Sequence, residues 1–326
     1  MPMAPSTPPF QPQPEGTSSS ATNLACPQAD SPLRSPVLGK DCWILSGPTA
    51  AGKTALAVDM AARMRAEIVS VDSMAVYRGL DIGTAKPSPA QRSQINHHLL
   101  DLVEPGEIYT VARWLAAAAD AVEDCRSRGK QSLFVGGTPL YLRALRDGLD
   151  PQPARDPEFR QRLEEEVQQS GPGPLHARLA TGDPVAAARI HPHDARRIIR
   201  ALEIGHVTGR PNPSSWFDNR PQDQEFASRM MVLDQPRRTL RERIDRRVEE
   251  MFAAGLIEET RAAAARPGGI GATASQAAGY TEALEVLAGR MTPQQAIQLT
   301  QQRTYQLAKR QLTWLRSFSG AIWIAA

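Results

Sequence analysis

Residues 42–54, CWILSGPTAAGKT, decide the fold that this chain can adopt. The apolar residues 42–45 at the start of the stretch predict a short buried strand, and the alanine-rich residues 55–65 predict a helix. The loop between them matches the pattern G-x-x-x-x-G-K-[ST] through Gly47, Gly52, Lys53 and Thr54. A strand, a glycine-rich loop and a helix in this order are typical of a phosphate-binding loop.

Each residue type in this loop has a physical role in holding an anion. Glycines let the backbone wrap around a phosphate group, so that successive N–H groups and the helix N-terminus face it. Lys53 adds a point charge, and the Thr54 hydroxyl is placed to ligate a Mg²⁺ ion that bridges phosphate oxygens. The alternative is a glycine-rich turn without a ligand. We expect a diphosphate or polyphosphate site made of Gly47, Pro48, Thr49, Ala50, Ala51, Gly52, Lys53 and Thr54.

The composition is that of an ordinary soluble protein. The chain has 326 residues, enough for one large domain with an insertion or for two domains. No apolar run approaches the roughly 20 residues that a membrane-spanning helix needs, so we expect no membrane partner. The three cysteines form neither a disulfide framework nor a zinc pattern, which favours a reducing, cytoplasmic location. A formal net charge of +3 says little about nucleic acid by itself.

Short apolar runs alternate with helical stretches from residue 41 onward. The candidate strands are Cys42–Ser46, Glu67–Val71, His98–Val103, Ser132–Val135, Arg229–Leu233 and Ala321–Ile324. The candidate helices are Lys53–Arg65, Val111–Arg128, Leu140–Arg146, Arg237–Ala254 and Pro293–Phe318. Strands separated by helices predict an α/β fold, with a parallel sheet flanked by helices.

Changes of composition along the chain predict its domains. Residues 1–39 are rich in proline, serine and glutamine and should be a disordered extension. Residues 40–150 should form the first part of the α/β core, and residues 225–326 its second part with basic C-terminal helices. The strand signal disappears between them, so residues 151–224 predict a small, mainly helical insertion.

Asp72 is the second chemical signal, because it follows the predicted strand 67–71. Ligands of open parallel sheets bind at the carboxyl ends of the strands, so Asp72 should face the same crevice as the glycine-rich loop. It could ligate Mg²⁺ through water, act as a general base, or only cap the next turn. The fourth strand ends in Gly136-Gly137-Thr138, which indicates either a close backbone approach to a ligand or a plain tight turn.

Basic residues cluster in three places downstream: Arg196 to Arg200, Arg237 to Arg247, and Arg303 to Arg316. The second cluster has six arginines, and the third contains Tyr305 and Trp314 among its cations. Cations interleaved with aromatic rings suit the RNA backbone and unstacked bases. The alternative is that each cluster is a solvated helix face. The pair His97-His98 lacks metal-ligand spacing, and we assign it no metal.

Five segments in order resemble the tRNA dimethylallyltransferases, also called tRNA isopentenyltransferases, of the bacterial type. They are GPTAAGKTALA (47–57), SVDSMAVYRGLDIGTAKP (70–87), VGGTPLYLRAL (135–145), ARIHPHDARRIIRALE (188–203) and QLAKRQLTWLR (306–316). The resemblance implies a P-loop-kinase-like core with a helical insertion and a Mg²⁺ cofactor. It also implies transfer of a dimethylallyl group from dimethylallyl diphosphate to N6 of adenosine 37 in the tRNA anticodon stem-loop. We expect the protein to act as a monomer.

The resemblance also carries roles to individual positions. It implies that the loop holds the diphosphate of the prenyl donor, that Asp72 is the general base and that Thr138 lines the reaction channel. The implied catalytic set is therefore Asp72, Lys53, Thr54 and Thr138. The implied tRNA contacts are Asp72, Ser73, Met74, Ala75, Thr138, Arg160, Arg196, Arg197, Ile198, Ile199, Arg200, Gln276, Gly279, Tyr280, Lys309, Arg310, Trp314 and Arg316.

Two other functions fit the glycine-rich loop without the resemblance. One is an ATP-dependent kinase of a small metabolite or nucleoside, and the other is a non-catalytic RNA-binding NTPase. Both would bind ATP in the loop, whereas a prenyltransferase would bind the diphosphate of its donor there.

Overall fold

A computed structural model describes residues 38–149, 153, 155–209 and 224–325. These residues form a six-stranded sheet in the order β3-β2-β4-β1-β5-β6. All strand pairings are parallel. The strands are β1 (Cys42–Ser46), β2 (Ala66–Val71), β3 (His97–His98), β4 (Gln131–Gly136), β5 (Met230–Asp234) and β6 (Ile322–Ala325). The predicted α/β class with a parallel sheet is confirmed.

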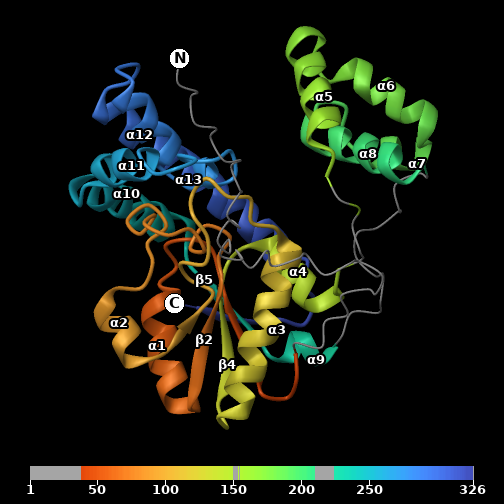
Figure 1. The fold of residues 1–326 in the computed structure, drawn as a ribbon. Helices are drawn as coiled ribbons and strands as arrows, with labels where there is room; N and C mark the ends of the chain where they lie inside the picture. Colours follow the sequence, from red (N-terminus) through yellow and green to blue (C-terminus); the bar gives the residue numbers. More distant parts are fainter. Residues whose placement is uncertain (1–37, 150–152, 154, 210–223, 326) are drawn as a thin grey trace, which may run out of the picture.

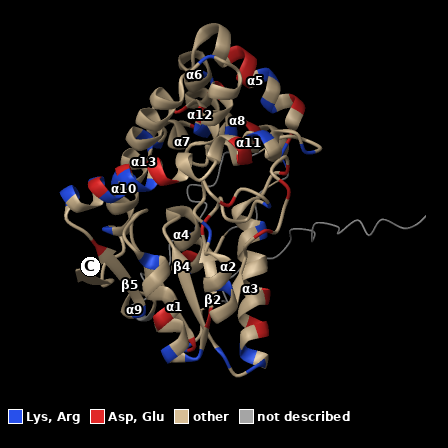
Figure 2. Cartoon of the chain, turned by 90° about the vertical axis from the view of Figure 1, so that its left-hand side faces the viewer, with Lys and Arg blue, Asp and Glu red and all other residues tan. Residues whose placement is uncertain are grey.

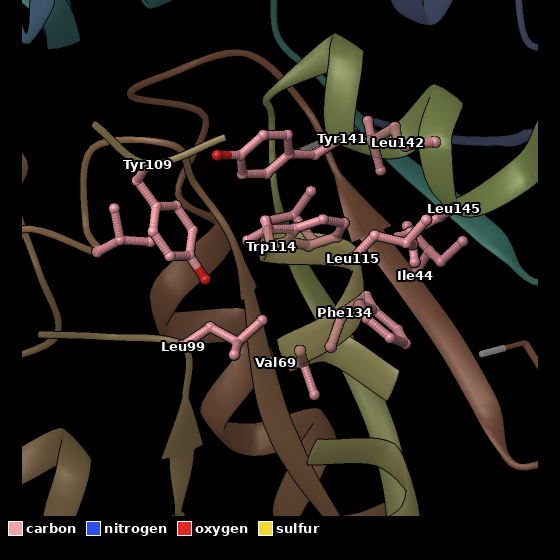
Figure 3. Packing of buried hydrophobic residues seen from close by; sticks show 14 of the residues in the cluster. Ile44, Val69, Leu99, Tyr109, Trp114, Leu115, Phe134, Tyr141, Leu142 and Leu145 are labelled. Atoms are coloured by element: carbon pink, nitrogen blue, oxygen red, sulfur yellow. The ribbon is translucent and has the colours of Figure 1, made fainter. Parts of the chain in front are cut away.

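Helices cover both faces of this sheet (Figure 1). The first part of the core contributes α1 (Lys53–Met64), α2 (Pro89–Gln94), α3 (Val111–Ser127) and α4 (Pro139–Asp147). Neighbouring strand residues point to opposite faces: Leu45 packs with the α1 residues Ala57 and Ala61, while Ile44 packs with Trp114 and other residues on the opposite side. Figure 3 shows this second cluster, in which Trp114 stacks on Tyr141 at 4.4 Å between ring centroids. Burial on both faces explains why the strands are continuously apolar.

A second group of helices follows β5 and lies at the carboxyl ends of the strands (Figure 1). Its members are α10 (Arg237–Ala253), α11 (Leu256–Ala264), the 3₁₀ helix Ala274–Gln276, α12 (Tyr280–Leu287) and α13 (Pro293–Leu315). The α10 stripe Leu240, Ile244 and Val248 repeats every four residues and packs against Ala308 and Leu312 of α13. The short helix α9 (Gln224–Ser228) leads into β5. In the described part of the chain, no helix is long and apolar enough to cross a membrane.

The predicted insertion contains four helices among its described residues, drawn together away from the sheet in Figure 1. They are α5 (Pro157–Ser170), α6 (Gly173–Gly182), α7 (Pro184–Arg189) and α8 (Ala195–Thr208). Their buried side chains, such as Leu163, Leu175 and Ile198, form clusters made of insertion residues alone. The exact domain limits stay predictions, since residues 150–152 and 210–223 lie outside the described residues. So do residues 1–37 of the predicted N-terminal extension.

The predicted strand His98–Val103 is wrong beyond its first residue. β3 ends at His98, because Leu99 and Asp101 have positive φ angles of 64° and 56°. A strand cannot continue through left-handed residues. The Asp101 carboxylate accepts hydrogen bonds from Lys86 Nζ (2.5 Å) and Arg92 Nη1 (2.8 Å), which fixes the turn. Sequence reasoning also missed α11 and α12 as separate helices.

A buried carboxylate joins the opposite, N-terminal ends of the strands. Glu67 accepts hydrogen bonds from both terminal nitrogens of Arg128, with one N–O distance of 2.8 Å, and from Asn96 at 3.1 Å. His98 Nε2 lies 2.7 Å from Glu67 Oε2. Cys125 completes a group with metal-ligand spacing, but the Arg128 guanidinium already neutralises the carboxylate. The Arg128 hydrogen bonds outweigh burial and lower the pKa of Glu67 to about 2.

We expect Glu67→Gln to lower the free energy of unfolding at pH 7 by about 2 kcal/mol, because it breaks a buried ion pair whose arginine is partly exposed. Denaturant unfolding measures this quantity. The carboxylate contributes stability that is fully present above its unfolded pKa and lost as pH falls towards 2. The gap between wild type and variant should therefore narrow below pH 4.5.

Glu242→Gln is the matched control, since Glu242 makes an exposed pair with Arg238 on α10. It should leave unfolding unchanged. Equal effects of the two substitutions would contradict the assigned role of Glu67.

Candidate active site

The glycine-rich loop runs from the end of β1 to the start of α1, as predicted. Gly52 precedes the helix with φ of 93°, a conformation that glycine adopts without strain. Side chains of Thr or Asp accept a backbone N–H at the starts of α3, α5, α8 and α13. No described side chain does so at the start of α1. The first-turn N–H groups of α1 therefore remain for an anion.

Lys53 folds back over the loop. Its Nζ donates hydrogen bonds to the carbonyl oxygens of Gly47 at 3.0 Å and Pro48 at 2.7 Å. Burial, with a smaller contribution from the positive charge of Arg247, lowers the pKa of Lys53 to about 8, although the negative charge of Asp72 acts in the opposite direction. The ammonium group thus lies among polar groups that lack enough negative charge to balance it. An anion bound in the loop would supply that charge.

Asp72 follows β2 and uses one carboxylate oxygen to hold the next turn. Its Oδ1 accepts the N–H of Met74 at 2.8 Å and of Ala75 at 3.4 Å. In the described residues, no hydrogen bond to Oδ2 is present. The capping role considered for Asp72 is therefore real, but it occupies one oxygen and leaves the other available for a proton or a ligand.

The carboxyl ends of β1, β2 and β4 are joined by short polar contacts. Ser46 Oγ donates to the Gly136 carbonyl at 2.8 Å, and the Thr138 N–H donates to the Val71 carbonyl at 3.2 Å. Thr138 Oγ1 in turn accepts the N–H of Ser73 at 3.2 Å. A Cβ atom on Gly136 would lie 2.3 Å from the Val71 oxygen. The glycine is thus explained by the approach of a neighbouring strand, without invoking a ligand.

Arg247 is a site residue that sequence reasoning missed. Burial lowers its pKa, and the negative charge of Asp72 acts in the opposite direction. Arg243, one turn earlier on α10, donates from Nη1 to the Ala51 carbonyl at 3.4 Å. The two arginines precede the buried residues Ile244 and Val248 by one position each, so they share a face beside the packed stripe. That spacing is the sequence signal that separates them from the exposed arginines of the same cluster.

The predicted tRNA-contacting residues fall into three groups by exposure. The exposed ones are Arg196, Arg197, Gln276, Lys309, Arg310 and Arg316. Those of intermediate exposure are Asp72, Ser73, Met74, Thr138, Arg160, Arg200 and Trp314. The buried ones are Ala75, Ile198, Ile199, Gly279 and Tyr280. Cations alternate with acidic residues along α5 and α10 (Figure 2).

The structure shows where the side chains of the buried group lie, and their contact with tRNA stays a prediction. The side chains of Ile198 and Ile199 pack in the interior of the insertion, and both are under 4% exposed. The Tyr280 hydroxyl donates to Glu259 at 2.6 Å and accepts the N–H of Gly83. The packed side chains of Ile198, Ile199 and Tyr280 therefore support the exposed residues around them.

Arg160 and Arg200 hold Glu203, a carboxylate with no exposed surface. Their nitrogens lie 2.8 Å and 2.7 Å from Glu203 Oε2. Burial alone would raise the pKa of Glu203, but the two guanidinium groups outweigh it and keep the pKa low. Arg196 is directed elsewhere, and its Nη1 donates to Gln276 Oε1 at 3.4 Å. Segments of the insertion and of the C-terminal helices, both predicted to bind tRNA, therefore meet.

Known protein families match this chain over most of its length. The family model described as IPP transferase matches residues 75–318, and the model described as isopentenyl transferase matches residues 40–105. A relative from Anaeromyxobacter dehalogenans, a tRNA dimethylallyltransferase, is 48% identical over 283 residues, covering 86% of this chain and 94% of the relative. A relative of the same name from Geobacter metallireducens is 44% identical over 283 residues, covering 86% and 91%.

Solved structures extend the comparison to the fold. The tRNA isopentenylpyrophosphate transferase of Bacillus halodurans is 37% identical and has a TM-score of 0.61, covering 87% of this chain and 89% of that one. A eukaryotic dimethylallyltransferase acting on tRNA is 26% identical, with a TM-score of 0.67 and coverage of 86% and 73%. The chain belongs to the IPP transferase family.

Proposed function

We propose that this protein transfers a dimethylallyl group from dimethylallyl diphosphate to N6 of adenosine 37 in tRNAs, giving N6-dimethylallyladenosine and diphosphate. Its relatives are named for this class of reaction. The observation that carries the proposal is that a carboxylate and a cation lie at one edge of the sheet: Asp72 directly follows β2, and Lys53 lies at the end of the glycine-rich loop after β1. Helix α10, which carries Arg247, contacts the same loop through a hydrogen bond from Arg243 to the Ala51 carbonyl. Cations suit a departing diphosphate, and a carboxylate beside them suits a proton leaving the nucleophile.

Asp72 is proposed to act on the adenine amine. The N6 lone pair is delocalised into the ring, so the amine is a weak nucleophile and becomes positively charged as its bond to the allylic carbon forms. Oδ2 of Asp72 accepts the released proton, while Oδ1 keeps the carboxylate fixed to the turn. General-base assistance of this kind contributes about 10²–10⁴-fold to a rate.

Lys53 and Arg247 are proposed to stabilise the leaving group. As the bond between the allylic carbon and oxygen breaks, its electron pair departs with the diphosphate. Once the donor is bound, the loop N–H groups and the two cations would face the diphosphate, so the charge that develops as the bond breaks would be stabilised without further reorganisation. Binding would free the Lys53 ammonium from the Gly47 and Pro48 carbonyls to meet phosphate oxygens.

The residues present fit a Mg²⁺ ion. The ion prefers oxygen ligands, and Thr54 offers a hydroxyl at the second position of α1. No hydrogen bond from a described residue occupies that hydroxyl, whereas Thr260 and Thr313 donate to the carbonyl four residues earlier. Thr54 would hold Mg²⁺, which supplies further neutralisation of phosphate oxygens when bound.

The exposed cations of α8 and α13 are proposed to bind the tRNA anticodon stem-loop. Lys309 and Arg310 lie on α13, and Arg316 directly follows this helix, which also contacts the glycine-rich loop through a buried residue. Adenosine 37 must leave its stack to reach Asp72, which costs a few kcal/mol that phosphate contacts can offset. We further propose that the protein acts as a cytoplasmic monomer.

A transfer assay separates this function from the two alternatives. Radiolabelled dimethylallyl diphosphate and unmodified tRNA should give labelled tRNA in the presence of Mg²⁺, because the site holds a diphosphate leaving group beside a base. Labelled ATP with the same tRNA should transfer nothing. Phosphorylation of a metabolite, or ATP hydrolysis without prenyl transfer, would instead select the kinase or the RNA-binding NTPase.

Two substitutions at Asp72 separate the base from the cap. Asp72→Asn keeps an oxygen that can accept the Met74 and Ala75 N–H groups but cannot take up the proton, so kcat should fall by about 10²–10⁴-fold. Thermal unfolding and tRNA affinity should stay near wild type. Asp72→Ala should lose activity and also destabilise the turn. Near-normal kcat in the asparagine variant would leave Asp72 as a cap only.

Arg247→Gln should lower kcat/KM for the prenyl donor by about 100-fold, since it removes a preorganised cation from the leaving-group site. Steady-state kinetics at saturating tRNA measure this. Arg246→Gln is the control, because Arg246 is exposed and lies 3.8 Å from Glu250. Similar losses in both variants would assign the effect to the net charge of α10.

A further inference from the structure

One amide side chain of α13 connects two loops of the active site. Gln311 is 8% exposed. Its Oε1 accepts the N–H of Thr49 in the glycine-rich loop at 2.9 Å, and its Nε2 donates to the carbonyl of Gly137 at 2.9 Å. Thr49 is 262 residues away from Gln311 in the sequence, so no local sequence pattern predicts this hydrogen bond.

The hydrogen bond from Gln311 to the Gly137 carbonyl helps explain why residue 137, in the turn after β4, is a glycine. A Cβ atom on Gly137 would lie 2.7 Å from the Gly47 carbonyl and 2.9 Å from Gln311 Nε2. The turn therefore has no room for a side chain, because the loop and the amide occupy that space. Gly137 and Gln311 form one fitted contact that sets the distance between the glycine-rich loop and the turn that carries Thr138.

Only an amide of this length satisfies both ends of the bridge. A glutamate would lack the N–H that Gly137 accepts, and an asparagine is shorter by one methylene group. The Thr49 N–H donates to Gln311 and is therefore not available to a phosphate group. The amide thus selects which loop N–H groups face the anion.

We propose that Gln311 is a positioning residue for the prenyl donor: it fixes the glycine-rich loop against the Gly136–Gly137 turn in the form that receives the diphosphate. The inference rests on the proposed function of that loop. Gln311 acts through the backbone and does not touch the donor. Its loss should therefore weaken donor binding and leave the exposed tRNA surface of the same helix intact.

The test compares Gln311→Met with Gln301→Met. Gln301 lies on the same helix and donates to the Asp245 carbonyl of α10 at 3.3 Å, far along the helix from the loop. Gln311→Met should raise KM for dimethylallyl diphosphate by about tenfold, the effect of two lost hydrogen bonds. KM for tRNA should stay within twofold. Gln301→Met should change neither constant.

Direct binding of inorganic diphosphate, measured by calorimetry, gives a readout independent of turnover. Its affinity should fall by a similar factor in Gln311→Met, and also in Gly137→Ala, where the new methyl group displaces the amide. The second variant keeps the test decisive if the first fails to fold. Wild-type diphosphate affinity in either folded variant would overturn the inference. A wild-type protein that binds no diphosphate would instead refute the proposed function of the loop.

Discussion

The parallel register of β1, β2 and β4 is the constraint on which the rest of the structure depends. It brings three carboxyl ends to one edge, where Val71 pairs with Gly136 and Leu45 with Val135. Hydrogen bonds from Ser46 and Thr138 then tie these ends together. The chemistry-bearing groups sit on short extensions of a rigid sheet, so their separation is fixed by backbone geometry. Such rigid placement is what preorganised charge stabilisation requires.

At the carboxyl ends of the strands, the cations Lys53 and Arg247 outnumber the carboxylate of Asp72. Burial lowers the pKa of both Lys53 and Arg247, and repulsion by Arg247 also lowers the pKa of Lys53. The carboxylate of Asp72 opposes both shifts, and Glu250 also opposes that of Arg247, but burial outweighs them. The Glu67 cluster at the opposite end of the strands is the reverse case, in which Arg128 neutralises the buried charge within the protein. Arg128 thus neutralises the buried Glu67 at the N-terminal ends of the strands, whereas the partly buried cations Lys53 and Arg247 at the carboxyl ends make no ion pair among the described residues. An incoming anion completes the balance.

Local patterns predicted the parts of the fold that depend on nearby residues. The strand–loop–helix context identified the glycine-rich loop, and the end of the second strand identified Asp72. The strand assigned to residues 98–103 failed because Leu99 and Asp101 adopt left-handed angles that their residue types do not indicate. Arg247 and Gln311 were missed as site residues because the groups they act on lie far away in the sequence: Gln311 bonds Gly137 and Thr49, 174 and 262 residues away, and Arg247 acts electrostatically on Lys53. Only the folded chain shows which face of a basic helix turns inward.

Basic residues close in sequence take different roles because some face the interior of the protein and others face solvent. On α8, Arg200 turns to the buried Glu203, whereas Arg196 and Arg197 stay exposed. On α13, Lys309 and Arg310 face solvent while Gln311 faces the loop. Exposed cations bind a polyanion through charge that salt screens, and buried groups act through fixed hydrogen bonds that salt affects little. Raising the salt concentration should therefore weaken tRNA binding far more than it disturbs the geometry of the diphosphate loop.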